Sequence, residues 1–123
     1  MIRPGDRLEH TRAITEDDIR RFVEISGDRG AHHVKPDAQG RVLAHGLLTA
    51  TLPTKLGGDL NFLARTMTFE FLKPVYAGDT LTCRGLVETV QPDGAKTRVS
   101  FSFDVVNQRG EIVMRGSSAG IVL

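Results

Sequence analysis

The 123-residue sequence contains one cysteine, Cys83, and this scarcity excludes two ways of stabilising a small domain. A single cysteine cannot form an internal disulfide, and a zinc site built on cysteines needs several of them. We therefore expect a fold that depends on its hydrophobic core, with Cys83 as a small buried residue in a strand. A chain of this mass buries about two thirds of its extended surface, which is enough for such a core.

The sequence also lacks an excess of charge of one sign, because sixteen Lys and Arg face fifteen Asp and Glu. Proteins that hold nucleic acid non-specifically carry a basic surface, and no stretch here concentrates Lys and Arg. No run approaches the ~18 apolar residues of a membrane span, and no apolar segment typical of a secretory signal follows Arg3. These absences predict a cytoplasmic protein with neither nucleic acid nor membrane as a partner.

Two helices are expected in the first half of the chain. Residues 15–26 have one apolar face, Thr15 and Asp18 are spaced as a capping box, and Gly27 follows. The segment 42–52 is the most apolar of the chain and predicts a helix buried nearly all round, which bends or restarts at Pro53. Gly57-Gly58-Asp59 is expected to end this helix, and the polar stretch 27–40 is expected to be a loop.

Everything after Gly58 is typical of strands. Alternating residues begin near Met67, continue through 79–90 and 98–105, and finish in a last strand from Ile112 to Ile121. Strands joined by tight turns predict an antiparallel meander. We therefore expect one α+β domain over residues 1–123, in which an antiparallel sheet wraps around a central apolar helix.

Two features could carry chemistry. Asp28 and His33 lie in the predicted loop, and a carboxylate beside an imidazole is a plausible acid/base pair. The alternative is that Asp28 caps a turn while the histidines are solvated. Gly46 could expose a backbone N–H at a helix N-terminus to a carbonyl that gains negative charge, or it could be needed for close packing. His45 alone is more typical of a hydrogen-bonded packing residue.

Three motifs together give a specific resemblance. Residues 25–33 read Ile-Ser-Gly-Asp-x-x-x-x-His, residues 44–48 read Ala-His-Gly-Leu-Leu, and residues 71–79 read Phe-x-x-Pro-Val-x-x-Gly-Asp. This combination resembles the MaoC-like hydratase/dehydratase family of hot-dog-fold proteins, which includes the (R)-specific 2-enoyl-CoA hydratases. The resemblance covers essentially the whole chain.

The resemblance implies an activity and a set of site residues. It implies a lyase that hydrates trans-2-enoyl thioesters of coenzyme A or acyl carrier protein to (R)-3-hydroxyacyl thioesters, or the reverse, without a metal or cofactor. Asp28 and His33 match the family's catalytic Asp and His, and Gly46 matches the glycine whose N–H binds the thioester carbonyl. His45 and, by a loose match, Thr54 are assigned to substrate binding. A homodimer or a higher homo-oligomer is expected.

The motif also departs from the family pattern, and alternatives remain open. Gly30 and Ala31 stand where the family usually has Asn-Pro, and His32 could replace His33 in a different loop register. A thioesterase on the same fold and a non-catalytic subunit that binds acyl thioesters are the two other functions that the sequence allows.

Overall fold

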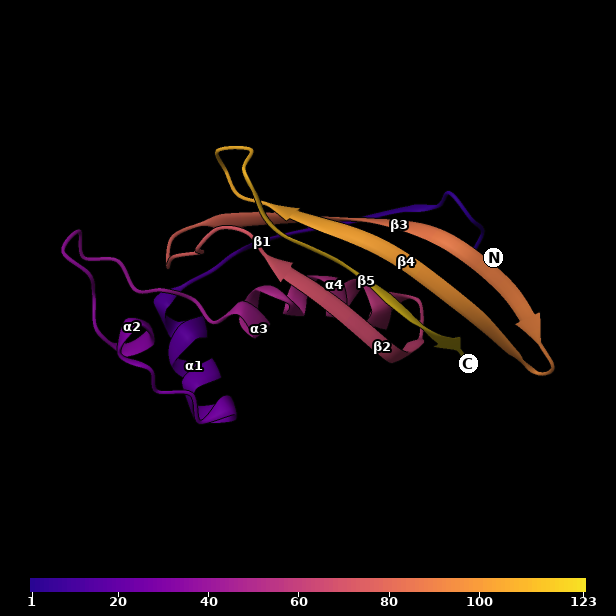
Figure 1. Ribbon diagram of the computed structural model, residues 1–123, viewed down its shortest axis with the longest axis horizontal. Coiled ribbons are helices and arrows are strands. Elements are labelled where there is room, and N and C mark those ends of the chain that lie inside the picture. The colour runs from indigo at the N-terminus through magenta and orange to yellow at the C-terminus, as the bar shows by residue number, and fades with distance from the viewer.

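A five-stranded antiparallel sheet forms one layer of the protein in the computed structural model, which describes residues 1–123 (Figure 1). The strands lie in the order β1-β3-β4-β5-β2, so that β1 and β2 are the two edges. The sheet thus contains the predicted meander, β3-β4-β5, flanked by strands from earlier in the chain. The strands are β1 Arg7–Ala13, β2 Phe62–Phe71, β3 Thr80–Asp93, β4 Lys96–Val106 and β5 Ile112–Val122.

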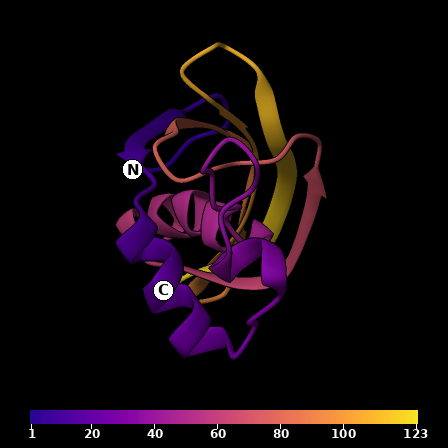
Figure 2. The same ribbon diagram turned by 90° about the vertical axis from the view of Figure 1, so that its left-hand side faces the viewer.

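Four helices complete the fold, and the sheet curves around the longer of the two central ones (Figure 2). Side chains from this helix and from the concave face of the sheet meet in one hydrophobic core, which includes Leu52, Leu56, Phe101, Val105 and Met114. Burial of apolar surface in this layer contributes most of the driving force for folding. None of the helices has the length and apolar character that a membrane span requires. The helices are α1 Glu16–Ser26, α2 Ala31–Val34, α3 Gly46–Thr49 and α4 Thr51–Asp59.

The expected first helix is confirmed together with both of its ends. The Thr15 hydroxyl accepts a hydrogen bond from the Asp18 N–H, and the Asp18 carboxylate accepts one from the Thr15 N–H. Gly27 ends the helix in the left-handed conformation, with φ of 74°. The buried position of Cys83 is confirmed as well, and burial raises the pKa of its thiol to about 12.

The predicted buried helix differs from the observed one at its start and in the position of its break, but not at its end. Residues 42–45 are extended, because the backbone of this segment is hydrogen-bonded to residues 75–77. The helix restarts at Thr51, ahead of Pro53, since proline has no N–H and is tolerated only in the first turn. The helix ends at Asp59, so the expectation that Gly57-Gly58-Asp59 ends it is confirmed.

One helix and one strand were not predicted from the sequence. The polar stretch 27–40 contains the short helix α2, and the N-terminal residues form β1, which pairs with β3. β1 has no clear alternation because it is an edge strand with only Leu8 and His10 half-buried. β2 also begins earlier than expected, at Phe62, and contains a bulge between Ala64 and Thr66 that interrupts the pattern.

Candidate active site

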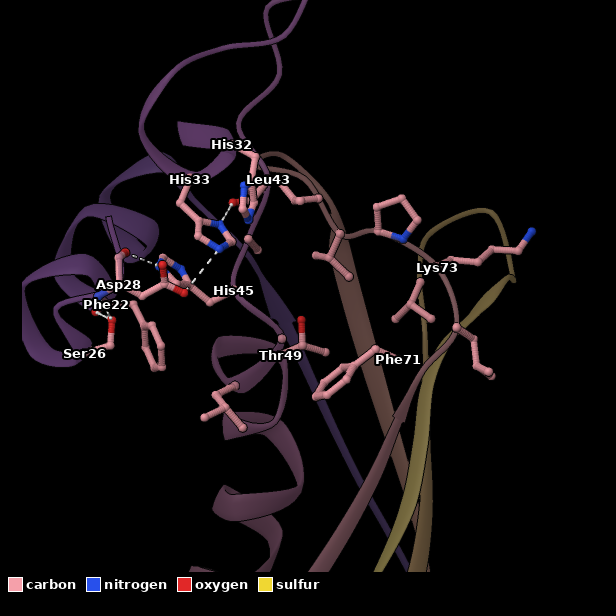
Figure 3. A pocket seen from close by; sticks show the side chains of 17 residues that line it. Phe22, Ser26, Asp28, His32, His33, Leu43, His45, Thr49, Phe71 and Lys73 are labelled. Atoms are coloured by element: carbon pink, nitrogen blue, oxygen red, sulfur yellow. Dashed lines mark hydrogen bonds and ion pairs between the residues drawn. The ribbon is translucent and has the colours of Figure 1, made fainter. Parts of the chain in front are cut away.

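A cavity of about 590 Å³ opens where α1, α2 and the start of α3 meet the end of β2 (Figure 3). Asp28, His33 and His45 gather on one side of it, and Phe71 points across from β2 on the other (Figure 3). The remaining wall is largely apolar, so a chain of methylene groups could be buried there. This wall includes Leu43, Ala44, Leu47, Leu72, Pro74, Val75 and Val113.

The loop between α1 and α2 places Asp28 at the mouth of the cavity. The Ser26 hydroxyl donates to the Phe22 carbonyl and accepts from the Asp28 N–H, which turns the chain out of α1. The Asp28 carboxylate then accepts a hydrogen bond of 3.1 Å from the Gly30 N–H. This hydrogen bond lowers the pKa of Asp28 below its ordinary value of 3.8, by more than partial desolvation raises it. The carboxylate is 56% exposed and ionised at neutral pH.

Helix α2 turns His33 inward and His32 outward. His33 is buried, whereas His32 is exposed and only tilts its ring against the ring of His33. His33 Nδ1 donates a hydrogen bond of 2.7 Å to the Leu43 carbonyl. Because a carbonyl can only accept, this bond fixes the tautomer and leaves Nε2 facing Asp28, 3.6 Å from its carboxylate oxygen Oδ2. The geometry therefore selects His33 over His32 as the partner of Asp28.

Gly46 brings free backbone donors to the same cavity. It is the first residue of α3, and neither its N–H nor that of Leu47 has a partner among the backbone hydrogen bonds of the fold. A Cβ on Gly46 would lie 2.8 Å from Cε1 of Phe71, so the Phe71 ring packs directly over this glycine. The close packing expected as one alternative for Gly46 is therefore present, and its N–H has no backbone partner.

His45 and Thr54 are placed differently from each other. His45 is buried beside the pair, and its Nε2 donates a hydrogen bond of 3.0 Å to the backbone carbonyl of Asp28. Thr54 donates its hydroxyl to the Ala50 carbonyl, one turn back in the helix, and does not line the cavity. The threonine that does line it is Thr49.

Asp28, His33 and His45 could in principle hold a metal, since their ligand atoms lie within 4.8 Å of one another. A metal ion bonds to an imidazole nitrogen in the plane of the ring, at about 2.0–2.1 Å for zinc. The rings of His33 and His45 are stacked, with centroids 3.7 Å apart and planes within 16°. One ion cannot lie in both planes at bonding distance, so the arrangement fits an acid/base pair better than a metal centre.

Several lining residues were missed by the sequence reasoning. Phe71 and Lys73 line the cavity and belong to the third motif, residues 71–79. Because this motif occurs together with the other two, it was the signal that could have indicated these residues. Lys73 is paired with Glu111 at 2.8 Å. Lys55 and Arg84 pair with the acidic residues Asp59 and Asp104 and lie outside the cavity.

Comparison with known proteins gives the family. A model of the MaoC-like domain matches residues 2–102. The chain belongs to the MaoC-like family. An (R)-specific enoyl-CoA hydratase of Rhodospirillum rubrum is 30% identical to it, over 98% of this chain and 88% of that protein. A mitochondrial 3-hydroxyacyl-[acyl-carrier-protein] dehydratase of Arabidopsis thaliana is 26% identical, over 100% of this chain and 78% of that protein.

Solved structures agree with this membership. The unliganded R-hydratase PhaJ1 of Pseudomonas aeruginosa superposes with a TM-score of 0.87 and 27% identity, over 98% of this chain and 81% of that one. An (R)-hydratase of A. caviae has the same TM-score at 22% identity, over 99% and 97% of the two chains. The hot-dog fold and the MaoC-like resemblance expected from the sequence are confirmed.

The state of the Asp28 carboxyl can be tested by titration. The Gly30 hydrogen bond favours the charged form, so we expect an Asp28 pKa below 3.8 in the folded protein. The contribution of this group to stability is then present at neutral pH and is lost as the pH falls through its lowered pKa. Carboxyl ¹³C NMR shifts recorded against pH measure it. A pKa of Asp28 at or above 3.8 would contradict the hydrogen-bonded geometry.

Proposed function

We propose that this MaoC-like protein adds water across the double bond of trans-2-enoyl thioesters to give (R)-3-hydroxyacyl thioesters, and catalyses the reverse dehydration. Membership in the family makes it an enzyme of the hydratase/dehydratase type. The observation that carries the finer proposal is the pairing of Asp28 with Nε2 of a buried His33 in a cavity that also contains free N–H groups.

The pair suits the activation of water. The carboxylate oxygen of Asp28 and Nε2 of His33 are both acceptors, so one water molecule can donate one hydrogen to each. This leaves a lone pair of the water oxygen free to attack C3 of the enoyl group. As the C3–O bond forms, one acceptor takes the proton that the water loses. The pair then returns a proton to C2, so the elements of one water molecule are added in total.

The thioester carbonyl receives the electron pair displaced from the double bond. The negative charge that develops on its oxygen is stabilised by hydrogen-bond donors that are already in place. The N–H groups of Gly46 and Leu47, at the start of α3, have no backbone partner and are the donors we assign to this oxygen. Removal of one such donor costs about 2.7–4 kcal/mol of transition-state stabilisation in acyl-transfer enzymes. The apolar wall opposite then accommodates the acyl chain, and the carrier, coenzyme A or acyl carrier protein, stays outside the cavity.

The acid/base pair can be tested with two conservative variants. Asp28→Asn keeps the shape and removes the charge, whereas His33→Asn retains a donor for the Leu43 carbonyl and removes Nε2. We expect each to lower kcat for hydration of crotonyl-CoA by about 10²–10⁴-fold. Asp59→Asn, at the exposed end of α4, is the matched control.

The assay follows the loss of enoyl-thioester absorbance, together with thiol release from saturated acyl-CoA. Activity unchanged in both site variants would refute the assigned roles. Thiol release without hydration would indicate the thioesterase alternative, and binding of acyl thioesters without turnover would indicate a non-catalytic subunit.

The carbonyl site can be tested by removing a single N–H. Gly46→Pro deletes the donor at a position where helices accept proline, and His45, with φ of −65° and ψ of 143°, already has the conformation that precedes proline. Gly46→Ala adds the same clash with Phe71 but keeps the N–H. We expect kcat of Gly46→Pro to be about 10²–10³-fold below that of Gly46→Ala. Equal kcat values in the two variants would exclude Gly46 as the donor.

The unpaired edge of the sheet supports the further proposal of a homodimer. β2 has no partner on its outer side, and apolar side chains are exposed on it and beside it. A second copy could cover this edge across a two-fold axis, next to the cavity. These exposed residues are Leu47, Leu63, Met67, Phe71 and Leu72.

We therefore expect Met67→Lys to weaken self-association, because the new charge would be buried against the second copy. Light scattering after gel filtration at micromolar concentration measures the mass, with Lys96→Glu in the β3–β4 hairpin as the control. A monomeric wild-type protein would refute the proposal.

A further inference from the structure

His45 lies directly behind the Asp28–His33 pair and contacts both of its members. Its side chain is 3% exposed, and its ring stacks on that of His33, with centroids 3.7 Å apart. Its other neighbour is Phe22, whose ring centroid is 4.8 Å away. The Nε2 hydrogen is donated to the backbone carbonyl of Asp28. One side chain thus fixes the backbone of the carboxylate residue and the ring plane of the imidazole (Figure 3).

Neither nitrogen of His45 is available to a substrate. Nε2 is engaged by Asp28, and Nδ1 is shielded from solvent without any hydrogen-bond partner. A buried polar atom without a partner destabilises the fold, and an apolar ring of similar size would not carry this cost. Stability alone therefore gives no reason for an imidazole at this position, whereas the hydrogen bond to Asp28 does.

We propose that His45 is a positioning residue for the hydration: its N–H holds the Asp28 peptide, and its ring holds His33, so that the two acceptors keep the separation at which they share one water. This inference rests on the proposed function. Asp28 is in a loop, and its other hydrogen bonds are to Ser26, the last residue of α1, and to Gly30, just before α2. His45 supplies the link from outside the loop, and it directly precedes Gly46 in the chain. His45 therefore fixes the position of the acid/base pair relative to the carbonyl site.

Two variants separate positioning from packing. His45→Phe retains a ring between His33 and Phe22, removes the unpaired nitrogen, and lacks the hydrogen for Asp28. His45→Gln loses the ring, but its amide N–H can reach the Asp28 carbonyl. We expect His45→Phe to be at least as heat-stable as His45→Gln and yet to have the lower kcat, about 10–100-fold below wild type with KM unchanged. His45→Gln should recover about tenfold of this loss. His10→Phe on β1 is the control.

A second readout does not need activity. The charge interaction with His45 also lowers the Asp28 pKa, and both variants at position 45 lose it, so the two variants are compared with each other. In His45→Phe the Asp28 peptide is released and its carboxylate moves away from the Gly30 N–H, so we expect its ¹³C titration midpoint to lie above that of His45→Gln. In His10→Phe the midpoint stays at the wild-type position. This titration decides whether His45 positions Asp28 even if no enoyl thioester is a substrate.

The possible outcomes separate the two ideas. No hydration by the wild type, with the titration shift present, would refute the proposed function and leave the positioning role intact. Wild-type kcat and titration in His45→Phe would overturn the positioning role. Activity that follows thermal stability across the variants would show a purely structural role, and a raised KM at constant kcat would show substrate binding; either result overturns the inference.

Discussion

The extended segment Val42–His45 is the connection on which the site depends, because it is hydrogen-bonded on both of its sides. Toward the sheet, the Ala44 N–H donates to Val75, and Val42 accepts from Ala77. Toward the loop, the Leu43 N–H donates to the His32 carbonyl while the Leu43 carbonyl accepts from His33 Nδ1. Four polar groups are paired in this way before α3 begins. The segment thus joins the histidine helix, the joint between β2 and β3, and the start of the central helix into one unit.

The fold was predictable where the side-chain pattern reports local structure. The capping box and glycine end of α1 are determined within a few residues, and the alternation in β4 follows directly from one buried face. β1 and the segment Val42–His45 were not predictable, because both are extended only through hydrogen bonds to residues far along the chain. The apolar character of residues 42–45 reflects burial, and burial alone does not distinguish a helix from an extended strand.

The candidate site, too, was predictable from the sequence only in part. The family resemblance named Asp28 and His33 together. The structure brings them side by side, because the short helix α2 turns His33 back toward the loop that holds Asp28. The choice between His32 and His33 could not be made from the spacing. Adjacent residues in a helix point in different directions, and the sequence did not indicate that a helix begins at Ala31. Thr54 fits a count along the helix, but the break before Thr51 changes which face is presented to the cavity.

Gly30, the departure from the family motif, packs against the exposed ring of His32. A Cβ at this position would be 2.9 Å from Cε1 of His32, so any other residue would displace that imidazole. The tilted ring of His32 in turn packs against the ring of His33, on which the ring of His45 is stacked. The Asn-Pro pair of the family would restrain this loop through a fixed backbone angle. Here the backbone is free of that restraint, and the His33 ring is held by its contacts with the rings of His32 and His45. The orientation of His33 therefore depends on side-chain stacking and on the Leu43 hydrogen bond.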